Sequence, residues 1–335
     1  MTRSLGVTVP DHALEAELLA GLDAVEGLLR DSVKSSYPFV TETSRHLVDA
    51  GGKRFRPLLV LLAAQFGEPA EPGVIPAAVV VELTHLATLY HDDVMDEAAL
   101  RRGAPSANAR WDNTVAILTG DFLFARASDL LADLGPEAVR IQARTFERLV
   151  TGQIRETVGP AEGEDPVEHH LSVLADKTGS LIATSGRFGA LLSGAPTVVV
   201  DLLAEFGERV GIAFQLSDDL LDVESTSAES GKTPGTDLRE GVPTLPVLQL
   251  RRMAAAGPLD VDGGRLLALT SGPIEGDAEH AEALALLRAH PALEAARAEL
   301  RRYAEAARAL LADLPDVPAR AALAAVCDAV VARHS

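Results

Sequence analysis

The sequence predicts an all-α fold, a single-domain helical bundle around a central cavity, and three observations support this. Apolar residues recur at helical spacing through nearly the whole chain, and no window keeps the alternation that indicates a strand. Alanine and leucine dominate a composition that is 47% hydrophobic but only 4% aromatic. One acidic pattern, Asp-Asp-x-x-Asp, occurs twice inside apolar stretches, as expected when two helices of one bundle face each other across a cavity. We therefore assign one domain, residues 1–335, and expect residues 1–10 to be flexible.

Helices are expected wherever the apolar spacing continues, and they end where Gly and Pro cluster. The valine runs at 79–81 and 198–200 are β-branched, but each continues into a long helix-periodic stretch. The expected breaks lie at 67–73, 103–105, 159–166, 231–243 and 257–276, and each is short or flanked by apolar helix, unlike an interdomain linker. The expected helices span residues 11–35, 39–50, 55–66, 74–99, 112–133, 136–156, 168–195, 197–225, 243–256, 279–289, 292–313 and 317–333.

Charge and cysteine content limit the partners and the compartment. A net charge of −19 disfavours nucleic acid and anionic membrane surfaces as standing partners. The lone Cys327 cannot form an internal disulfide, which fits a reducing cytosol. Residues 1–10 contain no apolar run of the signal-peptide type, and no uninterrupted apolar stretch reaches membrane-spanning length. We therefore expect a cytoplasmic protein.

The acidic pattern covers Asp92–Asp96 and again Asp218–Asp222. In a helix, the first and last aspartates of each copy lie one turn apart on one face. Stacked carboxylates in an apolar setting repel one another and lose hydration unless cations neutralise them. Mg²⁺ is favoured, because it is held by a few carboxylates together with waters and substrate phosphates. A single copy could arise by accident on a solvated face, but two copies with apolar flanks argue against that.

Cationic residues next to these motifs suggest phosphate sites. Lys53, Arg54 and Arg56 gather where a helix begins, and a helix N-terminus attracts anions. Arg101 and Arg102 follow the first motif, where arginine forks could bind phosphate or could simply cap a helix C-terminus, and both can hold together. Three lysines beside Gly or Thr are either point-charge phosphate binders or ordinary loop lysines. These lysines are Lys53, Lys177 and Lys232.

Taken together, these features resemble a known family. The order and spacing of several motifs from about residue 40 to 250 match those of the family. These motifs are the segment Gly51–Pro57, His85 seven residues before Asp92, the two acidic motifs and three further pairs. The further pairs are Lys177-Thr178, Phe214-Gln215 and Gly231-Lys232. The chain is similar to the trans-isoprenyl diphosphate synthases (polyprenyl synthetases), and most resembles the long-chain polyprenyl diphosphate synthases of actinobacteria.

The resemblance implies a prenyltransferase that condenses isopentenyl diphosphate head-to-tail onto an allylic diphosphate primer, giving an all-trans polyprenyl diphosphate for isoprenoid biosynthesis. It also implies Mg²⁺ as cofactor, with three ions per active site, a homodimer, and at most transient membrane contact. Carried over to this sequence, the metal ligands would be Asp92, Asp96, Asp218 and Asp222, with Asp93 and Asp219 beside them. The allylic diphosphate would be held by Arg101, Lys177 and Lys232, next to Thr178 and Gln215. Isopentenyl diphosphate would be held by Lys53, Arg56, His85 and Arg102. Glu156 would be a further acidic residue near the metals, although a solvated helix end explains it equally well.

Product length should depend on the helix that precedes the first motif. Short-chain members of the family carry bulky aromatic residues there, whereas Thr84, Ala87 and Thr88 are small, so we expect a long tunnel and a long-chain product. Tyr90 is expected to point away from this path and to pack in the core. The alternatives are a shorter-chain synthase that makes geranylgeranyl diphosphate, or a non-catalytic subunit of a heteromeric synthase.

Overall fold

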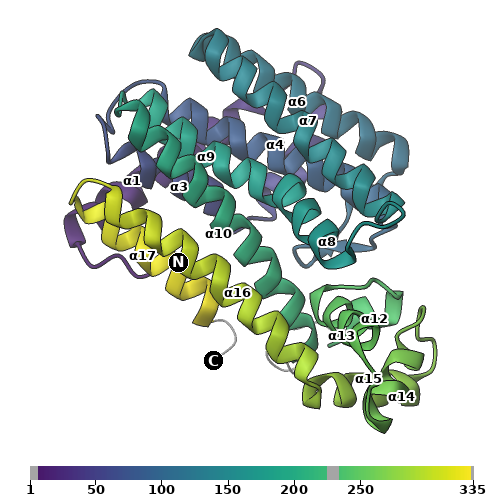
Figure 1. The fold of residues 1–335 in the computed structure, drawn as a ribbon. Helices are drawn as coiled ribbons and strands as arrows, with labels where there is room; N and C mark the ends of the chain where they lie inside the picture. The colour runs from purple at the N-terminus through teal and green to yellow at the C-terminus, as the bar shows by residue number, and fades with distance from the viewer. Residues whose placement is uncertain (1–6, 225–233, 333–335) are drawn as a thin grey trace. The chain divides into compact units, whose positions relative to one another are not determined.

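The computed structural model describes residues 7–224 and 234–332, and these residues are almost entirely helical (Figure 1). The first part contains α1 (His12–Ser32), α2 (Pro38–Asp49), α3 (Phe55–Ala64), α4 (Val74–Met95), β1 (Leu100–Arg101), β2 (Ala104–Pro105), α5 (Ala107–Arg110), α6 (Asn113–Leu134) and α7 (Pro136–Val158). The second part contains α8 (Pro166–Leu174), the π-turn η1 (Ala175–Gly179), α9 (Ser180–Leu192), α10 (Thr197–Glu224), α12 (Thr236–Glu240), α13 (Leu245–Ala256), α14 (Val261–Leu269), α15 (Asp277–Ala289), α16 (Pro291–Leu310), the 3₁₀ turn η2 (Leu311–Asp313) and α17 (Pro318–Ala332). The prediction of an all-α fold is confirmed: β1 and β2 pair as one short antiparallel hairpin.

Most of the expected helices are present, with ends shifted by a few residues, but three expectations were wrong. The helix expected over 74–99 ends at Met95, and a hairpin follows. The helix expected over 168–195 begins at Pro166 and is interrupted by η1. The expected break at 257–276 contains α14, whose first turn is capped by the Asp260 carboxylate accepting from the Gly263 amide at 2.7 Å. Two short helices, α5 and α12, also lie where breaks or loops were expected.

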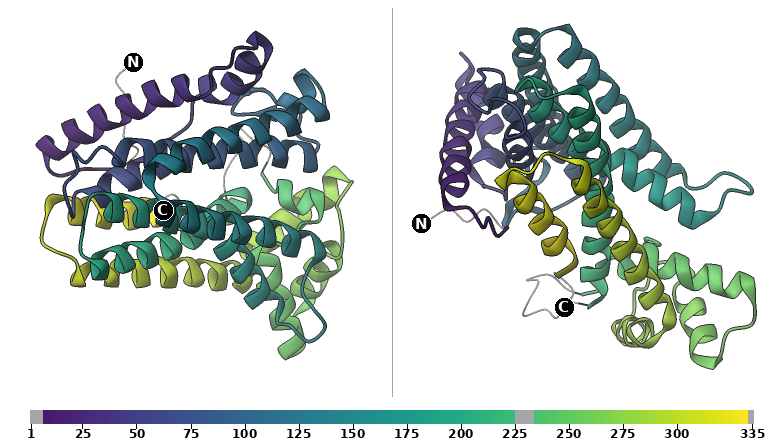
Figure 2. Two further views of the ribbon diagram at one scale, coloured as in Figure 1. Left: turned by 90° about the horizontal axis from the view of Figure 1, so that it is seen from above. Right: turned by 60° about the vertical axis from the view of Figure 1, so that its left-hand side comes forward.

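The described residues divide into two compact units, and helices α7, α9, α10 and α17 each contribute residues to both. Unit 1 comprises residues 7–147, 181–207 and 311–325. Its central helix is α4, which is buried on nearly every side and packs against α1, α3 and α6. Helix α1 covers the outside of this unit (Figure 2). Among the described helices, α4 alone is long and apolar enough to cross a membrane, but its burial in unit 1 is typical of a core helix.

Unit 2 comprises residues 148–180, 208–224, 234–310 and 326–332. The second half of α10 supplies Ile212, Leu216, Leu220 and Val223 at helical spacing to its apolar core. Helix α13 packs against α8 and α16, and α14 packs against α15. Each unit therefore has an apolar core of its own. The assignment of the whole chain to one domain stays a prediction, as does the flexibility of residues 1–10, of which the structure describes only residues 7–10.

Candidate functional site

The loop before α3 places its arginines in opposite environments. Gly51 and Gly52 have φ angles of 85° and 138°, and Arg54 adopts the left-handed conformation with φ 49°. The Arg54 guanidinium is buried between Glu26 and Glu82, at 2.5 and 2.8 Å. The expectation that Arg54 joins the anion site is therefore wrong, because two carboxylates already neutralise it. Lys53, one residue earlier, is exposed.

Arg56 lies in the first turn of α3 and has no comparable partner. Its buried Nε has no hydrogen-bond partner in the structure. Burial, reinforced by the positive charge of Arg102 and partly offset by Glu82, lowers the pKa of Arg56 to about 10. Burial also lowers the pKa of Arg102, and Arg54 and Arg101 add to that effect.

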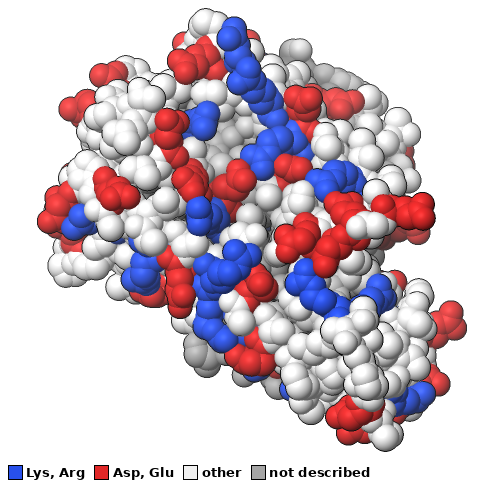
Figure 3. All heavy atoms as spheres, viewed as in Figure 1, with Lys and Arg blue, Asp and Glu red and all other residues white. Residues whose placement is uncertain are grey.

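His85 lies beside Arg56 and Arg102. It is partly buried on α4, and burial together with Arg56 and Arg102 holds the pKa of the imidazole well below its usual value. The ring is therefore neutral at pH 7, which limits the positive charge that this part of unit 1 must carry. The structure thus brings Arg56, His85 and Arg102 together, as predicted. Figure 3 shows basic side chains interspersed with acidic ones on the face viewed, so a net charge of −19 is compatible with such local cationic groups.

The β1–β2 hairpin sends two neighbouring arginines to different sites. Arg102 and Gly103 form its turn with φ angles of 54° and 77°, which is the geometry of a tight two-residue hairpin turn. The alternative that these arginines end a helix is therefore wrong. Arg101 Nε donates to Asp93 Oδ1 at 2.5 Å, whereas Arg102 Nη1 donates to the carbonyl of Leu47 at 3.0 Å and to that of Gly51.

The first acidic motif occupies the last turn of α4. Asp93 is fully buried, and burial raises its pKa against the opposing effect of the Arg101 hydrogen bond. Asn108 Nδ2 also donates to the Asp93 carbonyl at 3.0 Å. Asp96 caps the helix and is exposed, and Asp92, one turn earlier, is partly exposed. The middle carboxylate is therefore held by the protein, while the outer two lie nearer to solvent.

Tyr90 packs in the core as expected. The side chain is fully buried, its hydroxyl donates to the carbonyl of Thr43 at 2.5 Å, and the same hydroxyl accepts from the Leu47 amide at 3.3 Å. Both partners belong to α2. The prediction that this ring points into the core is confirmed.

The three small residues of the proposed tunnel differ in exposure. Thr84 and Ala87 are fully buried, while Thr88 is partly exposed. Thr84 Oγ1 donates to the Val80 carbonyl at 2.8 Å and accepts from Gln142 Nε2 at 2.8 Å. A polar link thus joins α4 to α7 at the level of Thr84, and nothing in the sequence signals this pairing of residues 58 positions apart.

The second acidic motif lies near the end of α10 in unit 2. Asp219 is buried, with Oδ2 3.2 Å from His170 Nε2 on α8. Asp218 is partly exposed. Asp222 accepts from the backbone amides of Thr236 and Asp237 at 3.0 and 3.1 Å, so its carboxylate caps the short helix α12. Neither role is visible in the sequence, because the partners are distant along the chain.

The π-turn η1 presents two of the predicted substrate ligands. Lys177 Nζ lies 2.6 Å from Glu156 Oε2, and Thr178 Oγ1 lies 3.4 Å from Gln215 Oε1. These predicted site residues therefore lie together in unit 2. Single π-turns inside helices are frequent at functional sites. A Cβ at Gly152 would lie 2.7 Å from the Lys177 amide nitrogen, so α7 can approach the turn only because residue 152 is glycine.

Arg148 fixes the other side of the same turn. Its guanidinium donates to Asp176 Oδ1 and to Glu208 Oε2, both at 2.8 Å. The two carboxylates raise the pKa of Arg148 despite the opposing effect of its burial. Arg148 therefore links α7, η1 and α10 within unit 2. This role could not be predicted, because an arginine in an amphipathic helix carries no sequence signal of it.

Carboxylate oxygens are suitable ligands for Mg²⁺, but neither motif alone forms a complete site. Across residues 7–224 and 234–332, no three His, Cys, Asp or Glu side chains gather closely enough to hold a metal ion. Mg²⁺ is commonly bound by one or two carboxylates plus waters and substrate phosphates. The outer aspartates of each motif fit that mode of binding, in which the substrate completes the coordination. The remaining predicted ligand, Lys232, lies outside the described residues.

Comparison with known proteins assigns the chain to a family. It is 53% identical to nonaprenyl diphosphate synthase of Mycobacterium tuberculosis, over 98% of this chain and 97% of that protein. It is 39% identical to heptaprenyl diphosphate synthase component 2 of Geobacillus stearothermophilus, over 93% and 95%. A structure of geranylgeranyl pyrophosphate synthase from Corynebacterium glutamicum, complexed with calcium and isoprenyl diphosphate, aligns with a TM-score of 0.87 at 46% identity, over 98% of this chain and 100% of that one. The family description "Polyprenyl synthetase" matches residues 37–258, and the chain therefore belongs to the polyprenyl synthetase family, whose members are divalent-metal-dependent prenyltransferases.

Proposed function

We propose that the chain condenses isopentenyl diphosphate with an allylic diphosphate to make a long-chain all-trans polyprenyl diphosphate. One observation carries this proposal: two arginines, Arg56 and Arg102, lie beside His85 on α4, the helix that also carries the first acidic motif. His85 and Asp92 are two turns apart on α4, and the hairpin supplies Arg101 to one group and Arg102 to the other. An anion site beside a metal site is what a pair of diphosphate substrates requires.

The cation group, which comprises Arg56, Arg102 and the neutral His85 beside them, would hold the diphosphate of isopentenyl diphosphate. Arginine forks bind phosphate oxygens in a two-pronged manner, and Arg56 has a donor without a partner. Neutral His85 can donate one hydrogen bond to the same diphosphate. Lys53, exposed on the adjoining loop, adds a point charge. Substrate binding would therefore relieve the repulsion among these cations.

The allylic diphosphate would be held by Arg101, Lys177 and Lys232, next to Thr178 and Gln215. Asp92, Asp96, Asp218 and Asp222 are the proposed ligands of the Mg²⁺ ions, three per active site. When bound, Mg²⁺ would neutralise the negative charge of the leaving diphosphate. To bind Mg²⁺, Asp222 would use carboxylate lone pairs other than those that accept from the Thr236 and Asp237 amides of α12. Asp93 and Asp219 would orient the motifs through Arg101 and His170.

The reaction then breaks one carbon–oxygen bond and forms one carbon–carbon bond. Diphosphate departs with the electron pair, and the double bond of isopentenyl diphosphate attacks the resulting allylic cation. A proton leaves the isopentenyl unit and passes to the departed diphosphate. Lys177 and Arg101 keep that diphosphate in place, and closure of the segment 225–243 would exclude water from the cation. Residues 225–233 of this segment lie outside the described residues.

Product length is proposed from the small residues on α4 and from the relatives. Thr84, Ala87 and Thr88 would line the path of the growing chain. The names of the relatives support three outcomes: a long chain such as nonaprenyl, a geranylgeranyl product, or a chain that works as one component of a heteromeric synthase. The 53% identity to a nonaprenyl diphosphate synthase favours the first.

An assay of the purified chain with Mg²⁺, isopentenyl diphosphate and farnesyl diphosphate separates these outcomes. Incorporation of label into products longer than geranylgeranyl, resolved by chromatography, would support the proposal. Activity that appears only after addition of a second protein would favour the heteromeric alternative. Replacement Ala87→Phe should shorten the product, and Thr88→Phe, at a less buried position, repeats the test with less disturbance of the core. Unchanged product length in both folded variants would remove this path for the chain.

We further propose a cytoplasmic homodimer with at most transient membrane contact. Helix α6 exposes Ile117 and Leu118, at 42% and 60%, which gives an apolar surface that a second copy could cover. The charge of −19 disfavours stable attachment to anionic lipid. Light scattering of the purified chain tests the dimer, and Leu118→Glu should shift it towards the monomer.

A further inference from the structure

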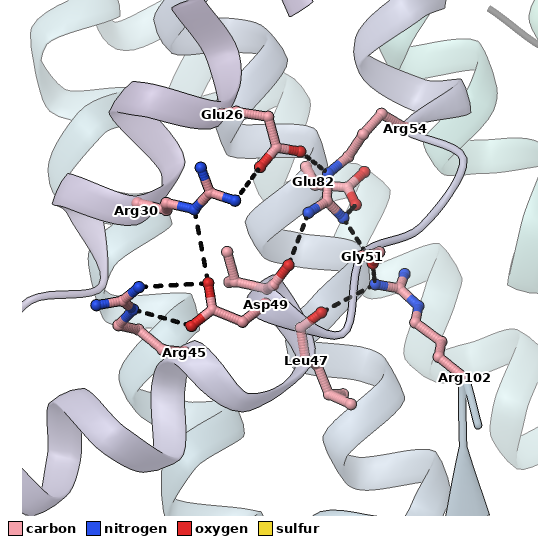
Figure 4. Close-up of polar contacts among 10 residues, drawn as sticks. Glu26, Arg30, Arg45, Leu47, Asp49, Gly51, Arg54, Glu82 and Arg102 are labelled. Atoms are coloured by element: carbon pink, nitrogen blue, oxygen red, sulfur yellow. Dashed lines mark hydrogen bonds and ion pairs between the residues drawn. The ribbon is translucent and has the colours of Figure 1, made fainter. Parts of the chain in front are cut away.

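Arg54 is the centre of a buried polar network that the proposed function does not use. Its side chain is only 2% exposed and donates through Nε to Glu26 of α1 and through Nη1 to Glu82 of α4 (Figure 4). Nη2 donates to the Val48 carbonyl at 3.0 Å, and Nη1 also donates to the Gly51 carbonyl at 3.1 Å. One side chain thus joins α1, α2 and α4 to the loop that precedes α3.

The network is balanced in charge, unlike the cation group beside it, because Arg54, Arg30 and Arg45 match three carboxylates, those of Glu26, Glu82 and Asp49. Burial alone would lower the pKa of Arg54, but Glu82 and Glu26 more than offset this and raise it. Glu26 also lies 3.6 Å from Arg30, which is half-exposed and in turn 3.5 Å from Asp49. Arg54 therefore has no charge to spare for a substrate, and its function must lie in what it holds in place.

The Gly51 carbonyl connects Arg54 to the proposed diphosphate site. This one oxygen accepts from Arg54 Nη1 and also from Arg102 Nη1 (Figure 4). The Arg102 guanidinium lies so close to the loop that a Cβ on Gly52 would be 2.9 Å from it. The position of Arg102 therefore depends on the conformation of residues 51–54, and Arg54 fixes that conformation from the core.

We propose that Arg54 is a positioning residue for binding of isopentenyl diphosphate, acting through the Gly51 carbonyl on Arg102. This inference rests on the proposed function. Its physical basis is that Arg54 supplies several fixed donors in a plane, so that the carboxylates on α1 and α4, the Val48 carbonyl of α2 and the Gly51 carbonyl of the loop constrain one another. A lysine keeps the charge but cannot make the same set of bonds.

Steady-state kinetics of the purified full chain test this with Arg54→Lys. The KM for isopentenyl diphosphate should rise about 10-fold or more, the scale seen when a residue that orients a metal ligand is replaced. The KM for farnesyl diphosphate and kcat should stay within about twofold, since they do not depend on the Arg102 position. Arg30→Lys is the matched control, because Arg30 contacts Glu26 but is not the donor to the Val48 and Gly51 carbonyls, which accept from Arg54.

A neutral variant guards against misfolding caused by unpaired buried charge. Arg54→Met combined with Glu26→Gln and Glu82→Gln removes all three charges, and such replacements of buried ion pairs are often tolerated. It should show the same selective rise in the KM for isopentenyl diphosphate. If both variants fold and bind isopentenyl diphosphate like the wild type in calorimetry, Arg54 is structural only and the inference is wrong. If the wild type itself fails to bind isopentenyl diphosphate, the proposed function fails instead.

Discussion

The two regions that carry the predicted site residues differ in how their charges are balanced. In unit 1, burial lowers the pKa of Arg56, His85 and Arg102. The charge of Arg102 adds to this effect on Arg56, and both arginines add to it on His85. Arg56 also retains a buried donor without a partner. In unit 2, Lys177 pairs with Glu156 at 2.6 Å, and Asp219 lies 3.2 Å from His170. The unit 1 group therefore places like charges close together, whereas these unit 2 side chains are each paired within the protein.

This difference predicts how replacements should behave. Where like charges are crowded together, removal of one should cost function without costing stability, because functional sites keep unfavourable arrangements that the rest of the fold sustains. Where a side chain is paired within the protein, its removal should lower stability as well. The same acidic motif occurs in both regions, so its aspartates allow a direct comparison.

The largest effect is expected for the first aspartate of each motif. Asp92→Ala and Asp218→Ala should each lower kcat by about 10³-fold, the scale for loss of a group that stabilises developing charge. Both should also raise the Mg²⁺ concentration needed for half-maximal activity. The control is Asp133→Ala, which removes an exposed carboxylate on α6 and should leave kcat unchanged. A loss in only one motif would show that the two do not serve one site.

A smaller effect is expected for Arg56 and Lys177, one cation from each region. Arg56→Gln should raise the KM for isopentenyl diphosphate about 10–100-fold, equivalent to about 1.5–3 kcal/mol for a hydrogen bond to a charged group. The free energy of unfolding should stay the same or increase, since an unpaired buried donor is removed. Lys177→Gln should instead raise the KM for the allylic substrate and lower stability by up to about 1 kcal/mol, as expected for a partly exposed ion pair. Urea denaturation with parallel kinetics checks both, and a destabilised Arg56→Gln would contradict the comparison.

The all-α fold and the family could be predicted from the sequence because both depend on local patterns. Apolar spacing locates most helices, and the order of Gly51–Pro57, His85 and the acidic motifs is specific. The end of α4 could not be predicted, since the pattern at 96–99 continues that of a helix, whereas Glu97 adopts a φ of 49°. The hairpin that follows depends on Arg102 in a conformation that non-glycine residues rarely adopt.

The separate roles of neighbouring charges were equally invisible in the sequence. Arg54 and Arg56 are two positions apart, yet one is neutralised by Glu26 and Glu82 and the other is not. Those carboxylates are each 28 residues away, so only the packing of α1 and α4 reveals them. Likewise, the cap that Asp222 provides to α12 depends on residues 14 and 15 positions later in the chain.

The last aspartates of the motifs should differ in stability more than in activity. Asp222→Ala should lower the free energy of unfolding by about 1–2 kcal/mol, because it removes a helix cap. Asp96→Ala, at an exposed helix end, should change stability by less than about 0.5 kcal/mol. Both should lower activity if both ligate Mg²⁺. Equal stability losses in urea denaturation would show that the α12 cap contributes nothing beyond a surface position.

The smallest effect concerns the pH dependence of stability and arises from His85. Burial and the arginines at 54, 56, 101 and 102 hold the pKa of this imidazole well below its usual value. Below about pH 6.5 the unfolded chain therefore takes up a proton that the folded chain does not, so the free energy of unfolding falls as the pH falls, by at most about 1.4 kcal/mol per pH unit. His85→Gln should lack this contribution. The difference in stability between wild type and His85→Gln should thus be constant above pH 7 and should turn against the wild type between pH 6.5 and 5. A difference in stability that does not vary with pH would mean that the pKa of His85 is not lowered by burial and the nearby arginines. The contrast between the two regions would then not hold for His85.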